Sequence, residues 1–157
     1  MAKKPQPDNI VCRNRRANHR FEVLEKLECG FALLGTEVKS LRDRNASIEE
    51  AYARIEGREL WLIGCHIAAY KFGHTANHEP LRPRKLLVHS REIGKLKTRV
   101  EQKGQTLVPL SIYFSARGVA KVSLGVVRGK KTADKRQDMK ARDAKRDIDR
   151  AMRKGRL

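Results

Sequence analysis

The chain has 157 residues and carries 36 lysines and arginines against 18 acidic residues, for a formal charge of +18. Such an excess attracts polyanions and favours nucleic acid over neutral ligands. No apolar run of about eighteen residues and no secretory signal occur, which excludes a membrane-spanning or exported protein and predicts a cytoplasmic one. The three cysteines form no CxxC pair and are expected to be reduced thiols.

The positive charge is concentrated in blocks, whereas solubility alone would be served by scattered charge. Residues 128–157 hold 13 basic residues against 5 acidic ones, and residues 82–99 hold 7 against 1. Residues 1–20 form a third basic block, while residues 21–81 are mildly acidic. Three blocks of one sign predict a footprint for an anionic partner.

The first half of the chain predicts short strands and one helical segment. Residues 21–34 predict two short strands around a turn or bulge at Gly30. Residues 36–42 suit one or two helical turns. Residues 51–66 predict a hairpin, because Gly57 lies between two apolar segments.

A polar loop over residues 71–83 is followed by a predicted helix. Ser90 is suited to cap its N-terminus, and Gly104 is suited to end it. Three apolar residues share one face of this helix: Ile93, Leu96 and Val100. Its exposed side is basic and consists of Arg91, Lys95, Lys97 and Arg99.

Residues 107–114 and 119–127 predict a last hairpin. Five or six short strands interrupted by a helix indicate a mainly β chain, for which we expect a small closed antiparallel barrel, an OB-fold, with two or three short helices. The predicted organisation is a flexible N-terminus over residues 1–9, a core over residues 10–127 and a basic tail over residues 128–157.

The tail differs in kind, because neither Gly nor Pro occurs between Thr132 and Lys154 and helix is permitted throughout. Its apolar stripe is thin and consists of Ala141, Ala144, Ile148, Ala151 and Met152. Such a stripe is too small to offset an ordering cost of about 1 to 2 kcal/mol per residue. We therefore expect a tail that is mostly disordered in the free protein and helical when bound.

His74 and His78 stand four residues apart with Glu79 adjacent, which raises the question of a metal site. Zinc sites usually need three or four convergent ligands, and this polar loop offers no helix face to bring them together. We therefore predict no metal and no cofactor. The chain also has no GxSxG, GxxxxGK[ST] or HExxH motif, so we expect no enzymatic activity.

The segment over residues 81–89 alternates cationic and apolar residues. Its cationic candidates for phosphate contacts are Arg82, Arg84 and Lys85. Leu87 and His89 are candidates to meet an unstacked base. The alternation alone leaves an ordinary core strand with charged edges equally open.

Two further residues are candidates for the same surface. His19 follows a short basic arm, which is either an RNA contact or a solvated terminus. Glu28 lies beside Gly30, and on an RNA-facing surface its carboxylate can accept a hydrogen bond from a base amino or imino group. Spacing alone does not decide between this role and simple exposure.

Five motifs follow one another along nearly the whole chain: NRRANH (14–19), GTEVKSLR (35–42), NASIEEAYA (45–53), HEPLRPRKLLVHSREI (78–93) and GKKTADKR (129–136). In these motifs the chain closely resembles the SsrA-binding protein (small protein B) family. The resemblance implies an OB-fold core that binds the tRNA-like domain of transfer-messenger RNA (SsrA, tmRNA) and delivers it to stalled bacterial ribosomes. This process, trans-translation, tags the nascent peptide for degradation and releases the ribosome.

Position by position, the resemblance implies RNA contacts by Glu28, Leu87 and His89, and it matches His19 to a histidine of a basic arm. The tail is implied to enter the empty mRNA channel next to the decoding centre and small-subunit RNA, and to become helical there. Its implied contact residues are Gly129, Lys130, Lys131, Asp134, Lys135, Arg136, Met152 and Arg153. Ala133 departs from the pattern, because members often carry His at this position. We expect a monomer.

Two alternatives of other classes remain open at this point. A structural ribosomal protein, or another ribosome-associated RNA-binding factor, also combines a small barrel with a basic tail. A metal-dependent nucleic-acid enzyme built around His74 and His78 would contain bound zinc.

Overall fold

The computed structural model describes residues 9–130 and 132–155, with residues 132–134 described by their backbone only. The predicted flexible segment at residues 1–9 therefore lies almost entirely outside the described residues. The strands are β1 (Ile10–Arg13), β2 (Phe21–Phe31), β3 (Ala46–Ser47), β4 (Tyr52–Glu56), β5 (Glu59–Ile63), β6 (His66–Ile67), β7 (Arg84–Leu87), β8 (Thr106–Phe114) and β9 (Ala120–Gly129). The helices are α1 (Ala17–Arg20), α2 (Gly35–Arg42), α3 (Ser90–Lys103), α4 (Thr132–Lys154) and the short 3-10 helix η2 (His74–Ala76).

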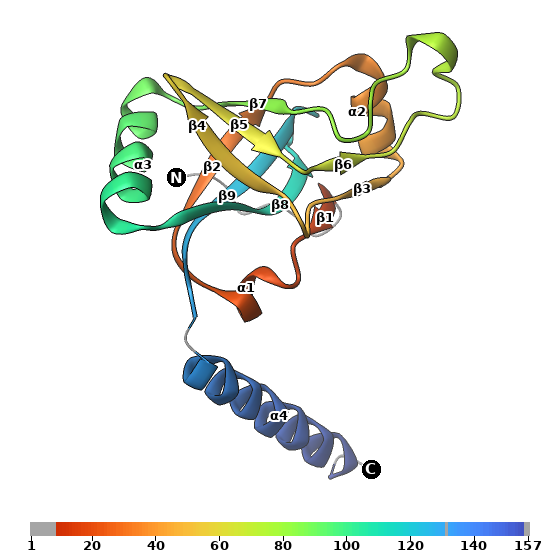
Figure 1. Cartoon of the computed structure of the whole chain (residues 1–157). Coiled ribbons are helices and arrows are strands. Elements are labelled where there is room, and N and C mark those ends of the chain that lie inside the picture. Colours follow the sequence, from red (N-terminus) through yellow and green to blue (C-terminus); the bar gives the residue numbers. More distant parts are fainter. Residues whose placement is uncertain (1–8, 131, 156–157) are drawn as a thin grey trace.

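One large antiparallel sheet dominates the fold (Figure 1). Starting from β8, the pairings run through β4, β5, β7, β2 and β9, and β9 pairs back with β8. β1 is added at the edge of β8, and the short β3 and β6 form a separate ladder. The expectation of a mainly β chain is thus confirmed.

Alternation along the strands directs one set of side chains into the core, whereas residues 124–127 of β9 are buried consecutively. On β5, Leu60 and Leu62 are fully buried, while the intervening Trp61 is only partly buried. On β9, Val122 and Leu124 are likewise fully buried. Each such side chain stabilises the fold by about 1.5 to 3 kcal/mol. α3 packs through Leu96, the buried member of its apolar face.

Both predicted hairpins are present. β4 and β5 pair from Tyr52 to Ile63 around a turn in which Gly57 has φ 61°. β8 and β9 pair from Thr106 to Val127, and β9 continues to Gly129, opposite Phe21. The sheet therefore extends two residues past the predicted end of the core at residue 127.

Two local predictions are wrong. Residues 21–31 form a single long strand, and Gly30 lies within it opposite Leu87 instead of forming a turn. Ser90 is the first residue of α3 and not its cap, because the extended His89 occupies the capping position without a side-chain hydrogen bond. The end of α3 at Gly104 is confirmed, with a left-handed φ of 62° that favours glycine.

The tail forms the helix α4, which extends away from the sheet beyond α1 (Figure 1). Nearly all of its described side chains are exposed, including Ile148 and Met152. The helical form of the tail is thus present, and its disorder in the free protein stays a prediction.

Candidate nucleic-acid interface

The outward face of β2 carries Glu28, which is exposed beside β9 and β8. Glu28 lies opposite Ser123 of β9, and Gly30 lies opposite Lys121. On β8, Tyr113 lies next to Lys121, and its hydroxyl donates a hydrogen bond to the Glu28 carboxylate. Burial raises the pKa of Tyr113 well above its ordinary value, and the bond to Glu28 raises it further. Tyr113 therefore stays a neutral donor that orients the carboxylate.

Leu87, at the end of β7, lies opposite Gly30, two residues along β2 from Glu28 and on the same face of the sheet. Its side chain is 51% exposed, whereas the preceding Leu86 is 1% exposed. Gly30 faces Leu87 across the ladder, and a Cβ atom at Gly30 would lie 3.0 Å from the Leu87 Cβ. The glycine thus lets β7 approach β2 closely, which places an exposed leucine on the Glu28 face of the sheet.

His89 follows Leu87 by two residues and immediately precedes α3. Its side chain is exposed, and its backbone carbonyl accepts hydrogen bonds from Glu92 and Ile93 in the first turn of the helix. The imidazole is therefore held at the helix start, facing solvent.

The prediction that Arg84 contacts phosphate is wrong, because its side chain is fully buried. Its guanidinium donates hydrogen bonds to the carbonyl oxygens of Cys65 (2.6 Å), Pro80 (3.1 Å) and Glu79 (3.3 Å). Its Nε lies 3.2 Å from a carboxylate oxygen of Glu37, which is also fully buried. Arg84 is a structural cation that joins β7 to the loop before it.

The other two cations of this segment are also paired. Arg82 donates to both carboxylate oxygens of Glu37, at 2.8 and 3.2 Å, and its side chain is about one-third exposed. Lys85 lies 3.1 Å from Glu59 on the adjacent strand and remains substantially exposed. Of the three predicted phosphate ligands, Lys85 is therefore the one whose cation is most accessible.

Glu37 is the residue around which these arginines gather, and sequence reasoning missed it. Burial by itself raises the pKa of Glu37, but the hydrogen bond from Arg82 and the charges of Arg84 and Arg82 outweigh it and hold the pKa below its ordinary value. One feature of the sequence pointed to this residue: Glu37 is the only acid in GTEVKSLR, and the segment LRPRK, whose two arginines pair with it, contains no acid.

His19 lies in α1, next to the point where the tail leaves the sheet. The Lys130 backbone N–H donates to the carbonyl of Arg20 at 3.2 Å, and its ammonium donates to the carbonyl of Asn18. The same ammonium forms an ion pair with Asp138 of α4. The hydrogen bond from Lys130 lowers the pKa of Asp138, and the charges of Lys130, Arg142 and His19 act in the same direction. Lys130 thus connects α4 to α1.

The remaining predicted tail residues are distributed along one exposed helix. Gly129 ends β9, whereas Lys135 and Arg136 lie in the first turns of α4 and Met152 and Arg153 in the last. Asp134 lies in α4, with its side chain outside the described atoms, and Lys131 lies outside the described residues altogether. Met152 is 63% exposed, so its apolar side chain is available to a partner.

A basic groove between the core and α4 was not expected as a unit. It has a volume of about 760 Å³ and lies over the outward face of β8 and β9. Its charged lining residues are Arg13, Arg15, Lys26 and Arg142. The basic blocks of the sequence gave part of this signal, but the topology was needed to bring Lys26 and Arg142 to the same groove.

The histidines considered for metal binding do not converge. His78 is buried, with Nδ1 2.8 Å from the Thr36 hydroxyl and Nε2 2.9 Å from the Ile67 carbonyl oxygen, whereas His74 is exposed in η2. In the described ranges 9–130 and 132–155, no group of three or more His, Cys, Asp or Glu side chains is placed to hold a metal ion. His78 therefore has a structural role.

The cysteines are poor nucleophiles. Cys29 and Cys65 are buried, and burial raises the pKa of each thiol to about 12. Both therefore stay protonated at neutral pH.

No helix in the described part of the chain is long and apolar enough to cross a membrane.

Comparison with known proteins decides the family. The model of the SmpB protein family matches residues 11–154. The chain belongs to the SmpB family. An SsrA-binding protein of Moorella thermoacetica is 53% identical over 144 residues, which cover 92% of this chain and 93% of the relative. One of Rhodopirellula baltica is 49% identical over 153 residues, covering 97% and 87%.

A solved structure, "tmRNA-SmpB: a journey to the center of the bacterial ribosome", contains a similar chain. That chain is 54% identical, matches with a TM-score of 0.65, and the match covers 77% of this SmpB-family chain and 85% of the other. Both the fold and the sequence of this chain are therefore those of an SmpB-family protein.

Proposed function

We propose that this protein is a non-enzymatic RNA-binding factor of trans-translation that binds the tRNA-like domain of transfer-messenger RNA and delivers it to stalled ribosomes. The observation that carries the proposal is the exposed Leu87 held on the Glu28 face of the sheet by the close approach at Gly30, in a chain of the SmpB family. The relatives named SsrA-binding protein, and the solved structure with tmRNA and the ribosome in its description, support the same function.

The core contacts in this proposal divide by chemistry. Glu28 accepts a hydrogen bond from a base amino or imino group, while Leu87 and His89 contact an unstacked base. Lys85 meets phosphate, as does the arm that carries His19. Arg82, whose side chain stays about one-third exposed beside Glu37, adds a further phosphate contact. The fully buried Arg84 acts indirectly, since its pairing with Glu37 fixes the loop before β7.

The tail contacts in this proposal lie on the ribosome. α4 enters the empty mRNA channel near the decoding centre, so that a vacant channel is distinguished from an occupied one and tagging and ribosome release follow. The proposed contact residues are Gly129, Lys130, Lys131, Asp134, Lys135, Arg136, Met152 and Arg153. The exposed, basic character of the described part of α4 supports this role.

We further infer the organisation of the chain. The return of the strand pairings from β9 to β8 supports a closed barrel of the OB type, which binds single-stranded or irregular nucleic acid in many proteins. The core and the tail are then separate functional units of a cytoplasmic monomer, with the boundary moved from residue 127 to the end of β9 at Gly129.

The proposal is tested by the affinity of the full chain for the tRNA-like domain, compared with an unrelated RNA duplex of equal length at the same moderate salt. Preferential binding of the tRNA-like domain is expected. Equal affinity for both RNAs would show only nonspecific attraction and would refute the proposal. A chain ending after Lys130, which preserves the β2–β9 ladder, is expected to keep this binding and to lose peptide tagging on stalled ribosomes.

A further inference from the structure

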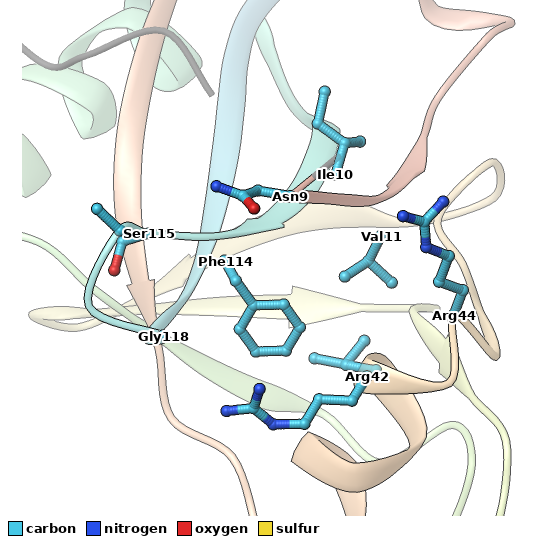
Figure 2. Close-up of a pocket in the computed structure, with 10 residues that line it drawn as sticks. Asn9, Ile10, Val11, Arg42, Arg44, Phe114, Ser115 and Gly118 are labelled. Atoms are coloured by element: carbon cyan, nitrogen blue, oxygen red, sulfur yellow. The ribbon is translucent and has the colours of Figure 1, made fainter. Parts of the chain in front are cut away.

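A pocket of about 370 Å³ lies at the end of the β8–β9 hairpin, away from the residues assigned above (Figure 2). It is formed by three separate parts of the chain: the start of β1, the end of α2 and the hairpin turn. Its volume is within the range of pockets that hold small ligands.

The wall of the pocket is apolar and aromatic. The side chains of Val11 and Phe114 point into it, and the guanidinium carbon of Arg42 lies 4.9 Å from the centre of the Phe114 ring (Figure 2). Leu41 completes this apolar side. Aromatic rings and guanidinium planes are the surfaces on which unstacked bases pack, and here the two are already placed together.

The rim of the pocket is cationic and polar. Arg42 and Arg44 both line it, and no acidic residue is among the described residues that do so. Arg44 has a left-handed φ of 59°, which is uncommon for a residue other than glycine, and it lies two residues after Arg42, the last residue of α2. This backbone turn brings a second arginine to the pocket that Arg42 enters from the helix.

The hairpin side of the pocket is preformed. The Ser115 N–H donates to the Val119 carbonyl at 2.8 Å, and the Gly118 N–H donates to the Ser115 carbonyl at 2.9 Å. The Ser115 hydroxyl accepts from the Val119 N–H at 3.2 Å, and Gly118 has the positive φ that the turn requires. A ligand would thus meet an ordered rim and lose little to loop ordering.

We propose that this pocket binds one unstacked nucleotide of a single-stranded RNA segment. Its base packs against Phe114 and the Arg42 guanidinium, and its phosphate lies at the rim beside Arg42 and Arg44. The site deepens the proposed function, on which it rests. Phe114 directly follows Tyr113 on β8, so the two side chains point to opposite sides of the strand, and the pocket is a contact site separate from the surface around Glu28.

The test uses the full chain and a hexamer of oligoadenylate, with tripolyphosphate as a probe that carries charge but no base. The oligoadenylate is expected to shift the Phe114 ring resonances saturably in NMR titrations, whereas tripolyphosphate, which can occupy only the cationic rim, is expected to shift them much less. R42Q is expected to weaken oligoadenylate binding about tenfold, because it loses both the stacking plane and a cation. F114L, which keeps an apolar side chain in the core, is expected to weaken it similarly.

R117Q is the matched control, since Arg117 is exposed in the same turn but does not line the pocket. It removes the same charge and is expected to change oligoadenylate affinity by less than twofold. Equal losses of oligoadenylate affinity in R42Q and R117Q, or unshifted Phe114 resonances, would refute nucleotide binding in the pocket. Affinity for the tRNA-like domain is measured in parallel. If oligoadenylate does not bind in the pocket while the wild type still prefers the tRNA-like domain, this inference alone is refuted. If the wild type shows no preference for the tRNA-like domain, the proposed function itself is refuted.

Discussion

The guanidinium of Arg84 and the carboxylate of Glu37 form an ion pair in which both side chains are fully buried. Their Nε and Oε2 atoms are 3.2 Å apart, and the remaining guanidinium nitrogens donate to three backbone carbonyls. The pair thus joins α2 to β7 and to the loop that precedes it.

Replacing Glu37 is expected to destabilise the core strongly. E37Q leaves the buried Arg84 charge without its counter-ion, and breaking a buried pair in this way costs about 3 to 5 kcal/mol. The free energy of unfolding in urea measures the loss. E59Q is the control, because Glu59 pairs with Lys85 at the surface and its loss costs at most about 1 kcal/mol. Equal effects of the two variants would contradict the structural role of Glu37.

The same pair predicts how stability depends on pH. The pKa of Glu37 is lower in the folded chain than its ordinary value, so ionised Glu37 stabilises the fold above its unfolded-state pKa of about 4.3. This contribution is lost as the pH falls through the lower, folded-state pKa. The difference in unfolding free energy between the wild type and E37Q is therefore expected to shrink on acidification below about pH 4. A difference that stays constant down to pH 2 would rule out the linkage.

The close approach at Gly30 predicts that even a methyl group is harmful there. G30A places a Cβ 3.0 Å from the Leu87 Cβ, so β2 and β7 must separate slightly, at a cost of about 1 to 3 kcal/mol. G94A is the matched control in α3, where the added Cβ meets nothing within 4 Å, and it is expected to stabilise the protein by about 1 kcal/mol. Thermal unfolding of both variants checks the opposite signs.

Leu87 is expected to matter for RNA and hardly for folding. Because its side chain is half exposed, L87A should leave the unfolding temperature nearly unchanged. Lost burial against a base, worth roughly 1.5 kcal/mol, should weaken binding of the tRNA-like domain about tenfold. L34A, at a leucine that is 49% exposed, is the control and should bind as the wild type does. An equal loss in both variants would remove Leu87 from the interface.

The contact between Lys130 and Asp138 predicts a separation of binding from tagging. D138N weakens the attachment of α4 to α1 at the start of β2, seven residues along the strand from Glu28. Binding of the tRNA-like domain should stay within twofold of the wild type, while peptide tagging on stalled ribosomes should fall. D147N, which affects only an exposed contact within α4, should tag normally. Normal tagging by D138N would show that this attachment is dispensable.

Much of the fold follows from local sequence patterns, and the failures share one cause. Alternation and turn glycines suffice for the hairpins at Gly57 and Gly118, because both ends of each pairing lie close together in the chain. Gly30 was misjudged because its role depends on Leu87, more than fifty residues away. A glycine within a strand and a glycine at a turn look alike until the partner strand is known.

The candidate site was predictable to the same degree. Alternation along residues 81–89 singled out Leu87 as a candidate to contact a base, and its side chain is exposed at the end of β7. Alternation could not show that the Arg84 side chain points into the core. A buried arginine needs a buried acid and several backbone carbonyls as partners, and these come from other segments of the chain. Tyr113 was missed for the same reason, since its relation to Glu28 exists only across the sheet.

The ladder of β2 and β9 also sets a length. Glu28 and Phe21 lie seven residues apart on β2, and Phe21 pairs with Gly129, where the tail begins. A β-bulge between Val23 and Glu25 makes these seven residues match six on β9, from Gly129 to Ser123. At about 3.3 Å per residue, the strand therefore separates Glu28 from the residue where the tail begins by about 20 Å. The length of β2 thus sets the distance between the two. A two-residue deletion between Glu25 and Glu28, outside the bulge, would preserve the inward and outward alternation while drawing the tail about 7 Å closer. The reach of the tail therefore depends on the length of β2, a strand that lies outside the tail.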